Sequence, residues 1–529
     1  EASVSDHPTS ALKRLAANRA AHHVPHLYAL WQVLQGDTDY REGRHQKART
    51  CWQRAADRLD AVRAQLPPVK LRTTYIRNQS SPHARLVAME LDHDPLQAAI
   101  WSERQKTAGV WRPTIIDSSH YPERAKIEAS LQTLAGQFSA LAHQVNAFGS
   151  ERGRAAQADS RIVGRLQRQI REELIRIESD ATSDLDSPER LHADIYRHSQ
   201  RHPIVQFHLT DSDIVAFVHH RSRTTVVKFP RGRGRLITAL QRWRFILEAE
   251  LLPDYPGKAE RHRVEDSLWE EIADWLWRPL GLSHDLPTVV IIPEGELANL
   301  PWEALRVDHQ SLGSRHSFIL APSIRHYAAA RTRMANSRTV EIFRGAGDNL
   351  PHVDTELRML QQIAGERARV HAPTTRNDWP SRGGADIWHF SGHAIMNEDN
   401  PFYSNLVLSD GPIFAVDFRM KQCVVNLATL AGCRSGEQVA VPGEESTGLV
   451  RSLLEMGARN VIAGRWPGSD QTAAIWMKTF YQQFFAGTDI LNAARAAAQN
   501  VKETFPSAFH WAAFAVFGAG DIGGTDETT

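Results

Sequence analysis

The sequence predicts an α/β protein with a mostly parallel sheet covered by helices on both faces, preceded by an all-α region and a small antiparallel β subdomain. Three observations predict this architecture. Apolar residues follow helical spacing up to about residue 185, three short runs rich in Val, Ile and Phe come next, and strand and helix patterns then alternate. Such alternation is typical of parallel strands joined by helices. We therefore expect three domains, residues 1–185, 186–285 and 286–529.

Length and composition are those of an ordinary protein of several domains. A chain of 529 residues is too long for one hydrophobic core, and its hydrophobic content of 42% and charged content of 23% are average for globular proteins. With 62 basic and 61 acidic residues, the chain has no overall field that would attract nucleic acid or an anionic membrane. The longest nearly apolar stretch, residues 511–517, is far shorter than the roughly 20 residues of a membrane span. We therefore expect neither a direct nucleic-acid site nor a membrane segment.

The cysteine content indicates a cytoplasmic protein. Three cysteines, Cys51, Cys423 and Cys433, are too few for disulfides to stabilise a chain of this size. Cys423 begins the apolar run that ends at Cys433, so we expect it to be a small core residue. No signal peptide is visible, and because the chain begins at Glu1 rather than Met, the sequence leaves open whether a further segment precedes it.

The N-terminal region contains one helix pair with a recognisable register. Gly36, Ala48, Trp52 and Ala55 match positions of a tetratricopeptide helix pair, and no clear second copy is visible. A lone repeat cannot bury its own face, so it either packs on neighbouring segments or ends an array. A generic helical hairpin is the alternative. In either case we expect these helices to bind a partner or a regulatory protein.

The remainder of the first domain, from about residue 122 to 177, is also predicted to be helical. Its charged segment 152–176 interleaves acids with basic residues and lacks aromatics for stacking, which favours a solvated helix face over nucleic-acid binding. Polar turn residues at 180–187 then mark the main domain boundary.

Further elements follow from periodicity and composition. An antiparallel meander is predicted at 204–209, 214–219 and 224–229, and helices follow at 236–252 and 264–280. The second helix carries tryptophans at core spacing, Trp269, Trp275 and Trp277. The later strands are predicted at 289–292, 317–320, 340–343, 387–390, 404–408, 423–429, 460–463 and 512–517. The later helices are predicted at 354–364, 447–456, 469–485 and 489–503.

The chemistry of the chain is concentrated in residues 386–436. Two apolar runs in this stretch each end in small residues and lead to one reactive side chain. The first is Asp-Ile-Trp-His-Phe-Ser-Gly-His at 386–393, which ends at His393. The second is Val-Val-Asn-Leu-Ala-Thr-Leu-Ala-Gly-Cys-Arg-Ser-Gly at 424–436, which contains Cys433. Open α/β sheets bind ligands beyond the carboxyl ends of neighbouring strands, so adjacent parallel strands would bring both side chains to one edge. His389 lies inside the first run, and we expect it to be a buried, hydrogen-bonded histidine.

Three segments of the C-terminal half resemble a known family. His-Phe-Ser-Gly-His at 389–393, Gly-Cys-Arg-Ser-Gly at 432–436 and Gly-Ala-Arg-Asn-Val-Ile-Ala-Gly-Arg-Trp-Pro-Gly-Ser-Asp at 457–470 together resemble the CHAT family of caspase-like cysteine proteases, relatives of separase. The resemblance covers roughly residues 204–518. It implies a caspase-like fold for the third domain and a pseudo-protease-like subdomain for the second.

The resemblance also implies a His–Cys dyad. Cys433 would attack a peptide carbonyl as a thiolate, while His393 withdraws its proton and later protonates the leaving amine. Backbone N–H groups of Cys433 and of the residue after the histidine would form the oxyanion hole. Relatives usually have Gly after the histidine, whereas this chain has Ala394, which keeps the N–H but not the conformational range of glycine.

Asp470 and Trp466 are the candidate substrate-binding residues. Separase-like relatives place an acid just past this tryptophan, in the pocket for a basic P1 side chain, so the resemblance implies such a role for Asp470. Asp470 is equally suited to cap the helix that starts near Gln471, and both interpretations stay open. The loop 437–446 is expected to be mobile and to be where a regulated protease changes state.

No cofactor and no metal are expected. Gly-Ala-Gly-Asp-Ile-Gly at 518–523 fits a dinucleotide-binding pattern but has no helix after it. The histidine pairs at 22–23 and 219–220 lack partner ligands at usable spacing, so we expect solvated histidines there. The predicted function is a regulated cysteine endopeptidase that cleaves a protein substrate, and the family resemblance points to a bacterial defence or signalling pathway. The alternative is a catalytically inactive scaffold that acts as an interaction module.

Overall fold

The computed structural model describes residues 24–65, 82–107, 188–252, 258–347, 352–380, 382–397, 401, 404–419, 421–432, 435–436 and 448–521. These residues fall in two compact units. The helices between residues 24 and 107 lie in the first unit, and the sheet with its flanking helices lies in the second. Cys433, the loop 437–446, the boundary segment 180–187 and the helical region predicted at 122–177 lie outside the described residues.

Between residues 24 and 107 the first unit contains two helix pairs, formed by α3 (Pro25–Arg41), α4 (His45–Gln65), α6 (Pro82–Glu90) and α7 (Pro95–Thr107). α3 approaches α4 closely at Gly36, where a Cβ atom would lie 2.5 Å from Nε1 of Trp52 and 3.2 Å from the carbonyl oxygen of Ala48. A larger residue would not fit there. The predicted helix pair is confirmed. The second pair, α6 and α7, was not apparent in the sequence. The tetratricopeptide assignment stays a prediction.

A bidentate ion pair joins the two helix pairs. Arg85 of α6 donates from Nε and Nη2 to the two carboxylate oxygens of Asp37 at 2.6 and 2.9 Å. Nε1 of Trp52 donates to the same carboxylate at 3.1 Å. Bidentate arginine–carboxylate pairs are directional as well as strong, so this contact fixes how α6 lies on the first helix pair.

The second unit is built on a mixed sheet in which the described residues form eleven strands. In spatial order these are β3 (Arg223–Phe229), β2 (Ile214–His220), β1 (Ile204–Leu209), β4 (Thr288–Ile292), β7 (Ser317–Leu320), β16 (Phe514–Gly518), β15 (Asn460–Gly464), β14 (Gln422–Ala431), β10 (Arg382–Ser391), β8 (Val340–Arg344) and β9 (Ala368–His371). β1, β4 and β7 are parallel, as are β15, β14, β10, β8 and β9. β16 joins the two sets, because it is parallel to β7 and antiparallel to β15. The predicted meander, β1 to β3, is confirmed and is continuous with the main sheet.

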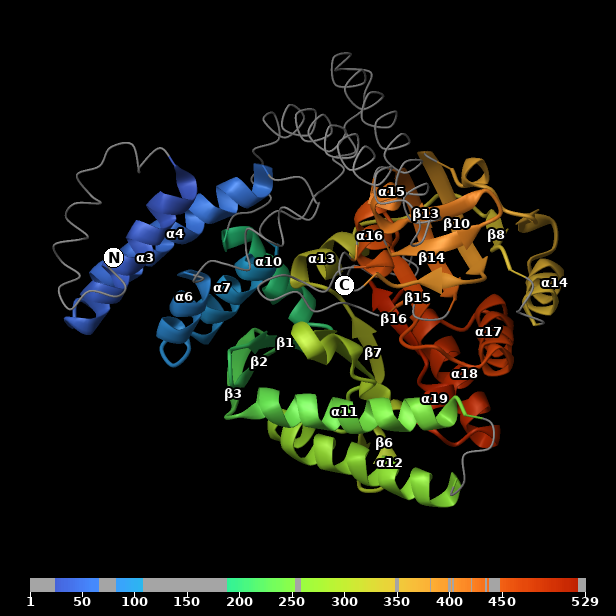
Figure 1. Ribbon diagram of the computed structural model, residues 1–529, viewed down its shortest axis with the longest axis horizontal. Coiled ribbons are helices and arrows are strands. Elements are labelled where there is room, and N and C mark those ends of the chain that lie inside the picture. The colour runs from blue at the N-terminus through green and yellow to red at the C-terminus, as the bar shows by residue number, and fades with distance from the viewer. Residues whose placement is uncertain are drawn as a thin grey trace, which may run out of the picture. The chain divides into compact units, whose positions relative to one another are not determined.

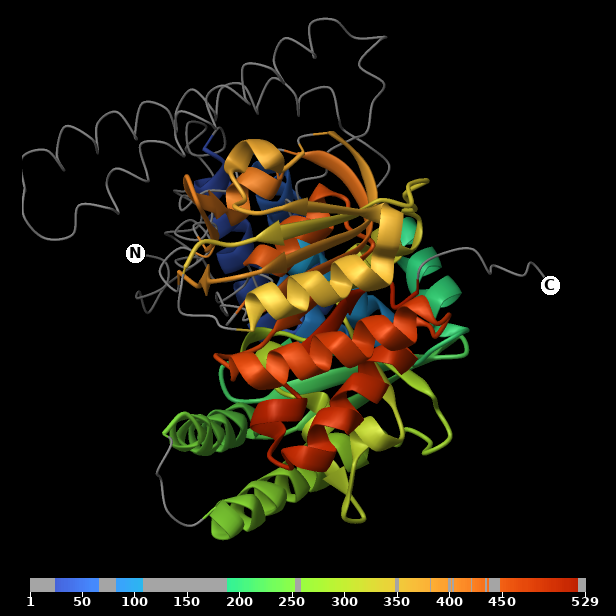
Figure 2. The ribbon, with the colours of Figure 1, turned by 90° about the vertical axis from the view of Figure 1, so that its right-hand side faces the viewer.

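Helices cover both faces of this sheet. One face carries α14 (Val353–Ala364), α17 (Asp470–Phe485) and α18 (Ile490–Thr504), and the other carries α13 (Ile324–Arg331), α15 (Ala415–Arg419) and α16 (Leu449–Met456) (Figure 1). Figure 2 shows the first set in front of the strands. The central strands are buried on both faces, which explains their nearly continuous apolar runs. The predicted α/β sheet with helices on both faces is confirmed, and a helical region precedes it in the sequence as expected.

Two long helices, α11 (Gly232–Glu250) and α12 (Lys258–Ile272), follow the meander. α12 continues into a π-helical turn, η3 (Ala273–Trp277), and a 3₁₀ turn, η4 (Arg278–Leu280). The three tryptophans predicted to be core residues are at most 9% exposed, which confirms that prediction. The shorter elements are α10 (Pro188–Ser199), η5 (Gly295–Asn299), η6 (Trp302–Ala304), β5 (Arg306–Val307), β6 (Gln310–Ser311), η7 (Leu312–Ser314), η8 (Gly365–Arg367), η9 (Arg376–Asp378) and α19 (Ala508–Trp511).

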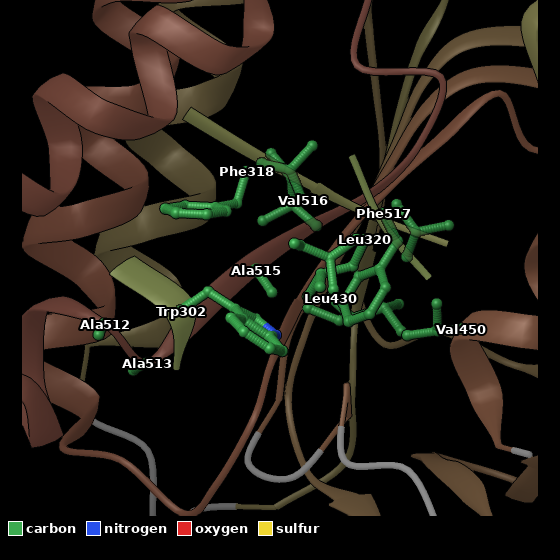
Figure 3. Packing of buried hydrophobic residues seen from close by; sticks show 14 of the residues in the cluster. Trp302, Phe318, Leu320, Leu430, Val450, Ala512, Ala513, Ala515, Val516 and Phe517 are labelled. Carbon is green, nitrogen blue, oxygen red and sulfur yellow. The ribbon is translucent and has the colours of Figure 1, made fainter. Parts of the chain in front are cut away.

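The hydrophobic core runs along the middle of the sheet. Figure 3 shows a part of it in which Trp302, Phe318, Leu320, Leu430 and Phe517 are all at most 3% exposed. These side chains come from η6, β7, β14 and β16, so the two parallel sets of strands share one core. Complete burial of a large apolar side chain stabilises the fold by roughly 1.5–3 kcal/mol relative to exposure, and this packing therefore holds the strand ends in place.

One predicted strand lies elsewhere than expected. The run at 404–408 forms β12 (Asn405–Leu408), which pairs antiparallel with β11 (Ala394–Ile395) and β13 (Gly411–Phe414) in a separate three-stranded sheet. Its placement in the main parallel sheet was wrong. The physical reason is the two-residue turn between β12 and β13, because so short a connection permits only antiparallel pairing.

The described residues contain neither a membrane-spanning helix nor a cluster of metal-binding side chains. Within the described helices, none combines the length and the apolar character that crossing a bilayer requires. In the same part of the chain, no three His, Cys, Asp or Glu side chains gather as a metal-binding group.

The expectation of a solvated histidine is wrong for His219, which is fully buried with Nδ1 2.8 Å from Oγ1 of Thr224. Burial lowers the pKa of His219 to about 3, so the ring is neutral there.

Candidate functional site

Three neighbouring strands end at the edge of the sheet where the sequence places its reactive residues. β10 is parallel to β14 with Ser391 opposite Ala431, and β14 is parallel to β15 with Leu430 opposite Ala463. His393 comes two residues after Ser391, and Cys433 comes two residues after Ala431. The register therefore brings the two chain segments that carry these residues to the same edge, as expected for neighbouring parallel strands.

The segments that follow β10 and β14 are in direct contact. A Cβ atom at Gly432 would lie 2.9 Å from the carbonyl oxygen of Gly392 and 3.1 Å from Cβ of Ala394. Any larger residue at 432 would push these segments apart. The residue directly before Cys433 thus lies against the residue directly after His393, although Cys433 itself lies outside the described residues.

Ser435 anchors the turn after β14. Its N–H donates to the carbonyl oxygen of Gly432 at 3.2 Å, and its hydroxyl donates to the carbonyl oxygen of Leu430 at 3.0 Å. The same hydroxyl accepts from the N–H of Gly464, the last residue of β15, at 3.1 Å. Because Ser435 is fully buried, these bonds are shielded from water and tie the described residues on both sides of Cys433 to two strands.

His393 is half-buried between β10 and β11, and two neighbours limit its position. Its carbonyl oxygen accepts from the N–H of Val407 in β12 at 3.0 Å. The loop after β8 lies against the ring, since a Cβ atom at Gly347 would be 2.7 Å from Cδ2 and 2.9 Å from Nε2 of His393. The imidazole is therefore confined on one side by backbone that has no side chain.

Ala394, the residue predicted to contribute an N–H to an oxyanion hole, is the first residue of β11. The hydrogen bond between Val407 and His393 makes Ala394 and Leu406 a non-hydrogen-bonded pair of the antiparallel ladder. In such a pair the N–H groups point away from the partner strand. Ala394 is also not among the described non-glycine residues with positive φ, so alanine serves at this position without a glycine-only conformation.

Replacing Gly347 with Ala is expected to displace the His393 ring. The new methyl group would overlap the ring, and the φ of +122° at this position is unfavourable for alanine. We expect peptide cleavage and alkylation of Cys433 to slow by up to roughly a hundredfold, because reacting groups displaced by about 1 Å lose that much. Rates of both reactions measured on purified protein check the prediction.

Gly383→Ala is the matched control for this variant. Gly383 has a φ of +117°, and no described atom lies within 4 Å of its Cβ position. The substitution Gly383→Ala therefore introduces similar backbone strain without touching His393. Equal rates for the two variants would show that Gly347 does not limit the ring.

Trp466 lies in the core rather than open to solvent. It follows β15, is 5% exposed, and packs on Trp243 of α11 with ring centroids 5.4 Å apart. Its Nε1 donates to the carbonyl oxygen of Phe509 at 2.9 Å. These contacts connect the loop after β15 to α11 and α19. They give the ring a structural role, and its contact with substrate stays a prediction.

Asp470 is the first residue of α17, and the residue in the N-cap position is Ser469, which makes no side-chain capping bond. Oδ2 of Asp470 instead accepts from the N–H of His352, at the start of α14, at 3.0 Å. His352 belongs to the connection between β8 and α14 that also contains Gly347. Asp470 is thus bonded to the same connection that contacts His393, and its role in substrate binding stays a prediction.

A buried polar cluster lies behind this edge, and sequence reasoning found only one of its members. His389 is fully buried and hydrogen-bonded, as predicted, with Nδ1 2.7 Å from Oγ1 of Thr429 and 3.0 Å from the hydroxyl of Tyr481. Its Nε2 lies 3.1 Å from Oε1 of Glu356. The available signal was that His389 and Thr429 are polar residues within apolar runs, each four residues before His393 or Cys433.

The two other cysteines are poor nucleophiles. Cys423 is 1% exposed, as predicted for a core residue, and burial raises the pKa of its thiol to about 11. Partial burial, with a contribution from Asp39, also raises the pKa of Cys51. Since the thiolate is the reactive form, neither thiol should compete with an activated cysteine near neutral pH.

Comparisons with known proteins give a domain match for the C-terminal half of the chain. Residues 266–519 match the CHAT domain. No curated protein matches the chain. These residues contain His393, Cys433, Trp466 and Asp470, and all but the last of them lie in the range 204–518 over which the sequence resembles the family.

The solved structures that match the chain have low sequence identity to it. Two crystal structures of the Saccharomyces cerevisiae separase–securin complex give TM-scores of 0.45 and 0.46 with 9% and 10% identity, over 98% of this chain and 48% and 49% of theirs. The Arg specific cysteine proteinase gingipain R gives a TM-score of 0.35 with 8% identity, over 52% of this chain and 69% of that chain. The chain thus spans about half the length of the separase-complex chains that it matches. The domain match thus places a CHAT domain at residues 266–519 of this chain.

Proposed function

We propose that this protein is a cysteine endopeptidase that uses Cys433 as nucleophile and His393 as general acid and base. One observation carries the proposal most directly. The strands before these two residues are paired in register, and Gly432 lies against Ala394 where the two segments continue. A nucleophile requires a base within hydrogen-bond reach, and this pairing brings the two segments to one place.

The reaction follows from the roles of these groups. His393 takes the proton from the thiol of Cys433, and the sulfur then bonds to the carbonyl carbon of the scissile peptide. The negative oxygen that forms is stabilised by the N–H of Ala394 together with that of Cys433. His393 next protonates the leaving amine as the peptide C–N bond breaks, and water hydrolyses the remaining thioester.

The substrate of this reaction is proposed to be a protein, with Asp470 and Trp466 contributing to its binding. Asp470 places a carboxylate on the connection that contacts His393, where it suits a basic P1 side chain. The N-terminal helix pairs are proposed to bind a regulatory protein, in the cytoplasm and within a defence or signalling pathway. The ion-paired packing of these helices supplies a folded surface for that partner.

Labelling with a peptide that carries a thiol-reactive electrophile tests the proposal. We expect modification at Cys433 and not at Cys51 or Cys423, because the pKa values of the latter two thiols are raised. Peptide mapping by mass spectrometry identifies the modified residue, and His393→Ala should slow the labelling strongly. Labelling of Cys433 that is slow and the same in wild type and His393→Ala would favour the inactive scaffold instead.

A further inference from the structure

Five buried polar side chains form a cluster on one face of the sheet. They are His389 and Ser391 of β10, Thr429 of β14, Glu356 of α14 and Tyr481 of α17, and each is at most 4% exposed. Residues at alternate positions of a strand share a face, so His389 and Ser391 both point toward α14 and α17. The residues next to them, Trp388 and Phe390, point to the opposite, apolar side.

The cluster gives both ends of the His389 ring a polar partner. Nε2 lies 3.1 Å from Oε1 of Glu356, an ion-pair contact that is not aligned as a hydrogen bond. Nδ1 lies 2.7 Å from Oγ1 of Thr429 and 3.0 Å from the hydroxyl of Tyr481. Burial raises the pKa of Tyr481, so its phenol keeps the proton and stays neutral in the cluster.

Glu356 has a second partner that lies nearer to the candidate site. Its Oε2 accepts from the hydroxyl of Ser391 at 3.0 Å. Ser391 is the last residue of β10 and comes two residues before His393. One carboxylate therefore contacts β10 at two successive positions on the same face, immediately before the strand delivers its histidine.

The four elements of the cluster are the elements that carry the candidate site. β10 leads to His393 and β14 leads to Cys433, four residues beyond Thr429. α14 follows the connection that contains Gly347, and α17 begins with Asp470. The cluster therefore joins the elements that lead to the reactive groups.

A polar cluster is an unusual way to hold a sheet and its helices together. Apolar side chains of similar volume would pack there without the loss of hydration that buried polar groups suffer, and burying an ion pair is often no more stabilising. Hydrogen bonds, however, are directional. They prevent packed elements from sliding or rotating against one another more strictly than apolar contacts do. The cluster is therefore suited to hold the ends of β10 and β14 in defined positions.

We propose that Glu356 and His389 are positioning residues that set where His393 lies relative to the segment that carries Cys433. The inference rests on the proposed function, because it assigns these side chains to that reaction. Neither residue touches the reacting atoms. They act through β10, with Thr429 and Tyr481 extending the contact to β14 and α17.

Glu356→Gln is the variant that tests the inference. It keeps the volume of the side chain and an acceptor for Ser391, but it removes the negative charge that faces His389. We expect alkylation of Cys433 by iodoacetamide to slow roughly ten- to a hundredfold at neutral pH and its pH profile to shift, because a displaced base no longer activates the thiol. The NMR signals of the ¹³C-labelled His393 ring should change as well, because the position of the ring changes.

Glu455→Gln provides a matched control. Glu455 of α16 is 2% exposed, and its Oε1 lies 3.6 Å from Nε2 of another buried histidine, His326. The same oxygen accepts from Nε of Arg451 at 2.9 Å, so Glu455 belongs to a buried polar cluster of its own. α16 is not one of the four elements. Its loss should lower the melting temperature about as much as Glu356→Gln does while the reactivity of Cys433 stays as in the wild type. Tyr481→Phe, which removes one hydroxyl, takes the place of Glu356→Gln if the latter fails to fold.

The outcomes separate this inference from the proposed function. Slower alkylation and changed NMR signals of the His393 ring in Glu356→Gln, but not in Glu455→Gln, would support the positioning role. If Glu356→Gln leaves both readouts as in the wild type, the inference is wrong, while a loss of reactivity in His393→Ala would still support the protease. If alkylation of Cys433 is equally fast in the wild type and in His393→Ala, the proposed function fails. The NMR signals of the His393 ring in Glu356→Gln then support or overturn the positioning role by themselves.

Discussion

Cys433→Ala is expected to reduce kcat/KM for a cleaved peptide by at least about a thousandfold, because the covalent step loses its nucleophile. His393→Ala is expected to reduce it by roughly 10²–10⁴-fold, since the thiol then has no base and the leaving amine has no acid. The two residues act as one unit, so the double variant should be hardly slower than the slower single variant. Steady-state cleavage of a peptide substrate, with melting temperatures recorded alongside, checks these values.

Cys423→Ala is the matched control for the nucleophile. Cys423 is 1% exposed and lies at the start of the same strand, β14. Its truncation should lower stability and leave the turnover of the remaining folded protein unchanged. Turnover in Cys433→Ala that stays near the wild-type value would remove Cys433 from the reaction.

Asp470→Asn is expected to weaken cleavage after basic residues by roughly ten- to a hundredfold, the value of a charged hydrogen bond of about 1.5–3 kcal/mol. The substitution removes the charge that would face an Arg or Lys at P1 and leaves that cation unpaired. Asn keeps an oxygen that accepts from the N–H of His352, so the connection between β8 and α14 should stay in place. Profiling on a peptide library with varied P1 residues measures the effect.

Two further variants make this result specific. Asp489→Asn changes an acid at the start of the next helix, α18, where the side chain caps by accepting from the N–H of Asn492 at 2.9 Å. Asn caps about as well as Asp, so this variant should cleave normally. Asp470→Ala removes both the charge and the bond to His352, and any additional loss of activity would measure the structural part. A preference for apolar P1 residues that is the same in wild type and Asp470→Asn would exclude the pocket role.

Much of the second unit follows from local patterns. The period-two and apolar runs that predict strands at 340–343, 423–429 and 460–463 correspond to β8, β14 and β15, because a buried parallel strand must be apolar on both faces. The prediction failed at β12, where a short turn to β13 matters more than composition. The second helix pair, α6 and α7, was not predicted, because no repeat position marks it as clearly as Gly36 and Trp52 mark the first pair.

The sequence by itself determined that His393 and Cys433 each follow a buried strand and that Ala394 keeps an N–H beside the histidine. These properties depend on residues a few positions apart, which local periodicity records. Only the tertiary structure decided that Ser391 lies opposite Ala431, that Trp466 packs on Trp243, and that Glu356 and Tyr481 meet His389. Those contacts join separate elements, such as Tyr481 and His389, which are 92 residues apart. They depend on how whole elements pack, and no local pattern of residue types encodes that packing.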